Sequence, residues 1–265
     1  MTTAIIGAGV MGETLLSGLL RAGVPKSELL IADRRIERSA EVTKEHGVAN
    51  GTNQEVAAKA DTVVLVVKPQ DMAIVLDEIK DSLRPGTLVV SLAAGITTGF
   101  MEDLLPAKTP VIRVMPNTPA LVDQGMAAIS SGTNSTEEHL VTVETLLRSV
   151  GQVVRVPEKY QDAVTAISGS GPAYIFYVVE AMIEGGVMLG LPRDVANELV
   201  LQTVYGAATM LRETNEHPTV LREQVTSPGG TTVAALRQFD DFKVRAAFLS
   251  AMEAARDRSR ELGQQ

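Results

Sequence analysis

Residues 4–12 read Ala-Ile-Ile-Gly-Ala-Gly-Val-Met-Gly, and this stretch decides the fold of the first half of the chain. A short apolar run ends at Gly7, and an apolar pattern with helical spacing begins near Met11. The first glycine permits a tight turn, the second lets a pyrophosphate approach the backbone, and the third lets helix and strand pack closely. Backbone amides at the start of the helix then face the phosphates. The stretch predicts a dinucleotide site at Gly7, Gly9, Val10, Met11 and Gly12.

The ribose end of this site is less sharply defined. Asp33 lies 21 residues after Gly12, at the end of the apolar run 29–32, where a carboxylate would meet a ribose hydroxyl of NADH. Arg34 and Arg35 follow at once and could hold a 2′-phosphate, or could equally be solvated residues at a helix start. We favour NADPH as the cofactor and expect NADH to be tolerated.

The rest of the first half alternates short apolar runs with helical patterns. Runs that are apolar on both faces and spaced by helices predict a parallel sheet covered on each side. We expect strands at 4–6, 29–32, 62–67, 88–92 and 111–114, with 127–130 and 152–156 extending the sheet. We expect helices at 11–22, 36–45, 71–79 and 136–149.

Three loops follow predicted strands at their carboxyl ends, where ligands bind in open α/β sheets. Each loop could be an ordinary surface turn, but together at one edge they favour function. The candidate cofactor contacts in these loops are Val67, Lys68, Pro69, Ala93, Ala94 and Asn117.

The second half changes character, because no convincing strand follows Pro157. Helices are expected at 160–167, 171–190, 192–213, 231–239 and 242–262. The helices 171–190 and 192–213 are apolar almost all round, which is typical of buried helices. A region this small has limited room to bury them alone, so we expect subunits to pack through it. The chain is therefore divided into a dinucleotide-binding domain, 1–157, and a helical domain, 158–265.

Composition narrows the function further. The 265 residues carry a net charge of −8 without a basic stripe, which argues against nucleic-acid binding. There is no cysteine, and His46, His139 and His217 lie far apart, so no metal site is expected. No signal peptide is visible, and the uncharged stretch 163–179 is interrupted by glycines and a proline. A soluble cytoplasmic protein that does not insert into membranes is expected.

The most unusual segment of the helical half is Ser227-Pro228-Gly229-Gly230-Thr231-Thr232. Pro-Gly-Gly breaks regular structure, and a helix is expected to start at Thr231. The Ser227 hydroxyl and the amides of residues 230–232 could form a pocket for a small carboxylate. An ordinary helix cap by a serine or threonine is the alternative, and physics alone favours it somewhat.

Taken in order, these motifs resemble those of the pyrroline-5-carboxylate reductases, nearly from end to end. The resemblance is carried by Gly7-x-Gly9-x-Met11-Gly12, Val67-Lys68-Pro69, Arg113-Val114-Met115-Pro116-Asn117-Thr118-Pro119, Ser168-Gly169-Ser170-Gly171-Pro172-Ala173-Tyr174, Gly190-Leu191-Pro192-Arg193 and Ser227-Pro228-Gly229-Gly230-Thr231-Thr232. It implies an α/β fold, with an N-terminal Rossmann domain and a C-terminal all-helical dimerisation domain.

The resemblance also implies an activity: NAD(P)H-dependent reduction of 1-pyrroline-5-carboxylate to L-proline, the last step of proline biosynthesis. It implies homodimers through the helical domain, often assembled into decamers. Thr232 would act at the ring nitrogen, and Asn53 would lie near the adenosine end of NADPH. The substrate carboxylate would be bound by Ser227, Gly229, Gly230 and Thr231.

Two other functions are compatible with the glycine turn. A β-hydroxyacid dehydrogenase would need a lysine in its first long helix, but residues 171–190 contain none. A non-catalytic dinucleotide sensor would have no use for a carboxylate pocket, so the segment 227–232 argues against it.

Overall fold

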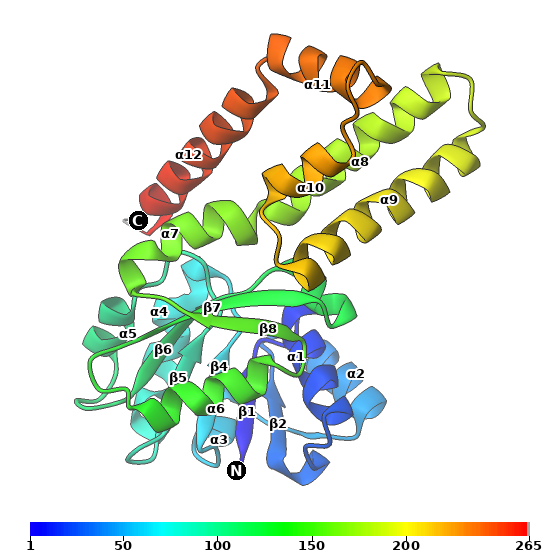
Figure 1. Cartoon of the computed structure of the whole chain (residues 1–265). Helices are drawn as coiled ribbons and strands as arrows, with labels where there is room; N and C mark the ends of the chain where they lie inside the picture. The colour runs from blue at the N-terminus through cyan, green and yellow to red at the C-terminus, as the bar shows by residue number, and fades with distance from the viewer. Residues whose placement is uncertain (264–265) are drawn as a thin grey trace. The chain divides into compact units, whose positions relative to one another are not determined.

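The computed structural model describes residues 1–263, which form two compact units (Figure 1). The first unit consists of Met1–Ser170 together with the chain from Ala255 onward, and the second is Gly171–Ala254. Residues 158–170, assigned to the helical domain from the sequence, thus belong to the same compact unit as the sheet.

The first unit is built on one eight-stranded sheet with strand order β3-β2-β1-β4-β5-β6-β7-β8. Strands β1 to β6 are parallel to one another, as expected for all of them except β3, which was not predicted. Their bounds are β1 Thr3–Ile6, β2 Leu29–Ala32, β3 Ala49–Asn50, β4 Thr62–Leu65, β5 Leu88–Ser91, β6 Val111–Met115, β7 Gly125–Ser131 and β8 Gly151–Arg155.

The sheet is not parallel throughout, because β7 runs antiparallel to β6 and β8 is parallel to β7. The sequence predicted that 127–130 and 152–156 extend the sheet, which they do, but it did not predict their orientation. The physical reason for the reversal is the connection from Met115 to Gly125, which holds only the short 3₁₀ helix Thr118–Val122. A parallel crossover needs roughly a dozen or more residues.

Helices cover both faces of the sheet (Figure 1). Most were expected from periodicity, but α3, α5 and the strand β3 were not, because elements this short show too few repeats of a pattern. The bounds are α1 Val10–Arg21, α2 Ile36–His46, α3 Asn53–Ala57, α4 Met72–Ile79, α5 Thr98–Leu104, α6 Glu137–Leu147 and α7 Gln161–Val164, which a π-helical turn, Thr165–Gly169, continues.

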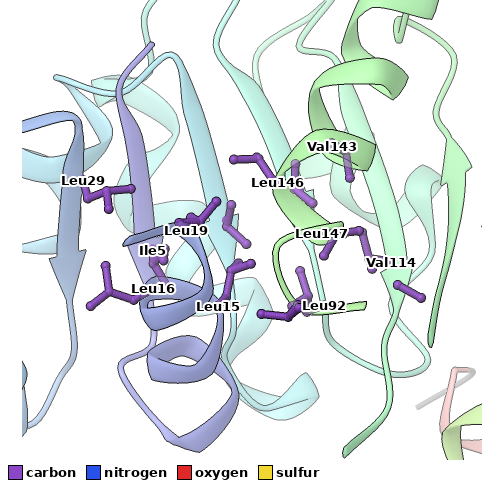
Figure 2. Close-up of a cluster of buried hydrophobic side chains, with 14 of the residues drawn as sticks. Ile5, Leu15, Leu16, Leu19, Leu29, Leu92, Val114, Val143, Leu146 and Leu147 are labelled. Carbon is purple, nitrogen blue, oxygen red and sulfur yellow. The ribbon is translucent and has the colours of Figure 1, made fainter. Parts of the chain in front are cut away.

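The core consists of two apolar layers, one on each face of the sheet. Ile5 of β1 belongs to the layer under α1 and α6, which Figure 2 shows with Leu15, Leu16 and Leu19. Its neighbours Ala4 and Ile6 point to the opposite layer. Successive residues of a strand face opposite sides, so a strand buried on both faces must be a continuous apolar run. The run 4–6 therefore places the turn at Gly7 on a rigid support.

The second unit is helical, and residues 158–263 contain no strand, as expected. Its helices are α8 Gly171–Met188, α9 Arg193–Thr214, α10 Pro218–Gln224, α11 Thr231–Asp241 and the first part of α12, Val244–Leu262. Helices α8 and α9 pack against each other, with a sharp turn at Gly190, where φ is 98°.

Large apolar side chains on these helices are exposed in the single chain. Phe176 and Tyr177 of α8 are 66% and 75% exposed, and Tyr205 of α9 is 68% exposed. Among the described residues, Glu158–Met188 is the one helical stretch long and apolar enough, by length and composition alone, to cross a membrane. Apolar surface on this scale marks a contact with a second molecule.

Candidate cofactor and substrate sites

A cleft of about 310 Å³ opens at the carboxyl ends of β1, β2 and β4. It brings together eight residues that were predicted from the sequence to bind the cofactor: Gly7, Gly9, Asp33, Arg34, Arg35, Asn53, Val67 and Lys68. An adjoining hollow of about 500 Å³ shares Asp33, Arg34 and Asn53 with it. A groove continuous through shared residues suits an extended ligand such as a dinucleotide.

The three glycines of the turn meet different surroundings. Gly7 has φ of 105°, and a Cβ atom there would lie 2.3 Å from the Val66 carbonyl oxygen. By contrast, a Cβ atom on Gly9 would have no neighbour within 4 Å. Gly9 is the N-cap of α1, and no side chain caps this helix start. The open space beside uncapped amides fits a phosphate group.

The Asp33 carboxylate is turned toward the protein. One oxygen accepts a hydrogen bond from the Ala8 amide at 2.9 Å, and the other accepts one from the Arg35 amide at 2.9 Å. The Asp33 side chain is 9% exposed, whereas the side chains of Arg34 and Arg35 are 74% and 62% exposed. The exposed charge beside Asp33 at this end of the cleft is therefore positive.

Asn53 and Lys68 both stand at the starts of helical turns that line the cleft. Asn53 is the first residue of α3, between Thr52 and Glu55 of the capping box, and its side-chain amide donates to Glu78 at 2.7 Å. Lys68 precedes the 3₁₀ turn Pro69–Asp71. Asp71 lines the cleft and pairs with Arg34 at 3.4 Å, a contact that no sequence motif signalled.

The remaining predicted cofactor residues do not line this cleft: Val10, Met11, Gly12, Pro69, Ala93, Ala94 and Asn117. Ala93 is buried two residues after the end of β5. The Asn117 side chain is engaged within the protein, since its oxygen accepts from the Met126 amide at 2.8 Å. Its amino group donates to the carbonyl and hydroxyl oxygens of Ser168 at 3.2 and 3.3 Å.

The segment 227–232 is a tight turn over 227–230 that leads into the first residues of α11, in the second unit. Gly229 has φ of 69°, and the Gly230 amide donates to the Ser227 carbonyl at 3.0 Å. Gly230 is the N-cap of α11, and no side chain caps the helix. The alternative of an ordinary cap by a serine or threonine is therefore wrong, and the first amides of α11 are left for another acceptor.

Comparisons with known proteins identify the family of this chain. Residues 158–262 match the family model for pyrroline-5-carboxylate reductase dimerisation, and residues 2–95 match that for coenzyme F420-dependent NADP oxidoreductases. The pyrroline-5-carboxylate reductase of Corynebacterium melassecola is 47% identical over 99% of this chain and 98% of its own. The Arabidopsis thaliana reductase is 42% identical over 98% of this chain and 94% of its own. This chain belongs to the pyrroline-5-carboxylate reductase family.

Solved structures of pyrroline-5-carboxylate reductases share the fold over the whole chain. The Coxiella burnetii structure superposes with a TM-score of 0.93 at 36% identity, covering 98% of each chain. The Plasmodium falciparum structure, which has NADP bound, gives 0.87 at 30% identity and covers 99% of this chain and 98% of its own. The family assignment decides against the β-hydroxyacid dehydrogenase interpretation.

The dimerisation match also explains the exposed apolar helices of this chain. The matched residues include the whole stretch Glu158–Met188. A second subunit is thus the expected cover for the aromatic side chains of α8, and the protein is an oligomer.

Proposed function

We propose that this protein reduces 1-pyrroline-5-carboxylate to L-proline with NADPH. The imine carbon gains a hydride and the ring nitrogen gains a proton, while NADPH becomes NADP⁺. The nicotinamide, when bound, supplies the hydride, and the protein contributes binding and orientation. The observation that carries the proposal is the cleft at Gly7 and Gly9. In the same chain, the start of α11 after the 227–230 turn has no side-chain cap, and its free amides fit a carboxylate.

In the proposed cofactor site, Gly9 and the amides of Val10, Met11 and Gly12 hold the pyrophosphate. Arg34 and Arg35 hold the 2′-phosphate, because their guanidinium groups are exposed while Asp33 bonds to the turn. NADH, which lacks that phosphate, is tolerated. The remaining cofactor contacts of the proposal are Asn53, Val67, Lys68, Pro69, Ala93, Ala94 and Asn117.

In the proposed substrate site, the Ser227 hydroxyl and the backbone of Gly229, Gly230 and Thr231 hold the carboxylate. Thr232 lies within the first turn of α11. Its hydroxyl is too weak an acid to protonate the nitrogen by itself near neutral pH. Thr232 therefore orients the ring nitrogen and passes it a proton from water.

The assembly and location are part of the same proposal. The functional helical domain begins at residue 158, after the dinucleotide-binding domain 1–157, and forms homodimers that can assemble into decamers. The protein works in the cytoplasm, outside membranes. Size measurement in solution and cell fractionation test these statements.

Absorbance of NADPH, followed with and without 1-pyrroline-5-carboxylate, tests the reaction itself. We expect substrate-dependent oxidation of NADPH, a slower rate with NADH, and L-proline as the product. Failure to consume either cofactor in the presence of substrate would overturn the proposed function.

A further inference from the structure

The peptide groups of Ala8, in the middle of the glycine turn, are held from two sides. The Ala8 amide donates to the Asp33 carboxylate at 2.9 Å. The Ala8 carbonyl accepts from Nε of Arg38 at 2.8 Å. Ala8 itself is 1% exposed. The turn therefore has a fixed orientation before any ligand arrives.

Arg38 is itself held in place by a chain of charged neighbours. Its guanidinium forms an ion pair with Glu13, in the first turn of α1. The second Glu13 oxygen lies 3.2 Å from Nε2 of His46, the last residue of α2. The side chains of Arg38 and Glu13 are each 24% exposed, and that of His46 is 16% exposed. Partial burial makes this ion pair stronger than one on the open surface.

Arg38 contacts the glycine turn, but it is not among the described residues that line the cleft. It also pairs with Glu41 at 3.4 Å, but the Glu41 side chain is 67% exposed. The hydrogen bond from Arg38 to the Ala8 carbonyl links Arg38 to the glycine turn. Gly9 and the uncapped start of α1 follow directly after Ala8.

We propose that Arg38 is a positioning residue for the pyrophosphate of the cofactor. By fixing the Ala8 carbonyl, it orients the Gly9 backbone and the first amides of α1 toward the phosphates. Binding is tighter when the site needs no ordering. The inference rests on the proposed function only in that the ligand is a dinucleotide phosphate.

Direct binding measurements on the full-length protein test this role. In Arg38→Met and Arg38→Lys we expect the Kd for NADPH to rise on the order of tenfold, the effect of losing one charge-assisted hydrogen bond. Adenosine 2′-monophosphate has no pyrophosphate, and its Kd should change less than twofold. At saturating NADPH, kcat should stay near that of the wild type while KM for NADPH rises.

Glu41→Gln is the matched control, because it alters only the exposed partner of Arg38, and its Kd for NADPH should match the wild type. If the Arg38 variants do not fold, Glu13→Gln loosens the same guanidinium and should weaken NADPH binding selectively, by a smaller factor. An unchanged NADPH Kd in the folded variants, or equal weakening of both ligands, would overturn the inference. Because Kd is measured without turnover, failure of the reductase proposal would be seen separately, as an inactive wild type.

Discussion

Gly12 lies directly against Gly7: a Cβ atom on Gly12 would come within 2.0 Å of the Gly7 carbonyl oxygen. Gly9, between them in the sequence, has empty space where its Cβ would be, and its φ of −70° suits any residue. The three glycines of one motif therefore serve two purposes. Gly7 and Gly12 are needed for the chain to fold, and Gly9 leaves room for a ligand.

Gly9→Ala is expected to fold like the wild type but to bind NADPH at least tenfold more weakly, because the methyl group occupies the space left for the pyrophosphate. Gly12→Ala is the contrast: its methyl group meets backbone, and overpacking costs about 1–3 kcal/mol of unfolding free energy. Thermal unfolding and an NADPH titration on both variants separate the effects. A Gly9→Ala protein with normal NADPH affinity would contradict this division.

Arg34→Gln should change the choice of cofactor. Arg34 is exposed at the rim of the cleft, with Asp71 as its ion-pair partner. We expect KM for NADPH to rise roughly tenfold and KM for NADH to stay nearly constant, because only NADPH carries the 2′-phosphate. Steady-state kinetics with each cofactor provide the measurement. Equal changes in both KM values would show that Arg34 does not recognise the phosphate.

Thr232→Ala should lower kcat about tenfold or more, since a positioned hydroxyl that relays a proton would be lost. Thr232→Ser keeps the hydroxyl and should recover most of the rate. Turnover at saturating substrate and cofactor is the relevant measurement. A kcat near the wild-type value in the alanine variant would refute a role for Thr232 at the ring nitrogen.

Low pH should weaken the interaction of Glu13, on α1, with Arg38 and His46, on α2. Burial acts to raise the pKa of Glu13, but hydrogen bonds from His46 and Arg38 outweigh it, so the pKa lies below its ordinary value. A lowered carboxyl pKa stabilises the fold above the unfolded-state pKa, about 4.3, and this contribution is lost as the pH falls through the folded-state value. Glu45 also lies near Glu13 and His46.

We therefore expect the unfolding free energy of the wild type to fall more steeply below about pH 4.3 than that of Glu13→Gln. Urea unfolding at several pH values measures this slope. At neutral pH the variant should be the less stable of the two. Parallel pH profiles for the two proteins would show that Glu13 has no such role.

Phe176→Glu should convert the oligomer to a smaller species, because a charge placed on the apolar surface of α8 would have to be buried against a partner. Ile74→Glu is the control, since Ile74 is 61% exposed on α4, in the first unit. Sedimentation of both variants provides the comparison. An unchanged mass for Phe176→Glu, with normal helix content, would place the subunit contact elsewhere.

The sequence predicted most elements of this fold because long, periodic segments carry a strong signal. Residues 29–32 were predicted as the strand that the structure shows, and α9 was found to within a residue at each end. The short helix α3 was missed, although Thr52 and Glu55 form a capping box that could have marked its start. The reversal at β7 depends on the length of a connection, which periodicity does not encode.

The cofactor site was predictable in part for a related reason. The spacing of the glycines indicates a tight turn between strand and helix, so the candidate roles of Gly7 and Gly9 could be predicted from the sequence. Arg38 could not, because it acts across space on Ala8 and no local pattern distinguishes it from other helix arginines. Asn117 stays a predicted cofactor contact, and its hydrogen bonds to Met126 and Ser168 could not be predicted because only the tertiary fold brings these partners near.

The exposed aromatic residues of α8 and α9 tie the stability of this protein to its abundance. When folding and subunit association are coupled, the midpoint of unfolding rises with total protein concentration by mass action. Dilution then lowers the midpoint of unfolding, and a newly made chain is at its least stable until it associates with a second copy.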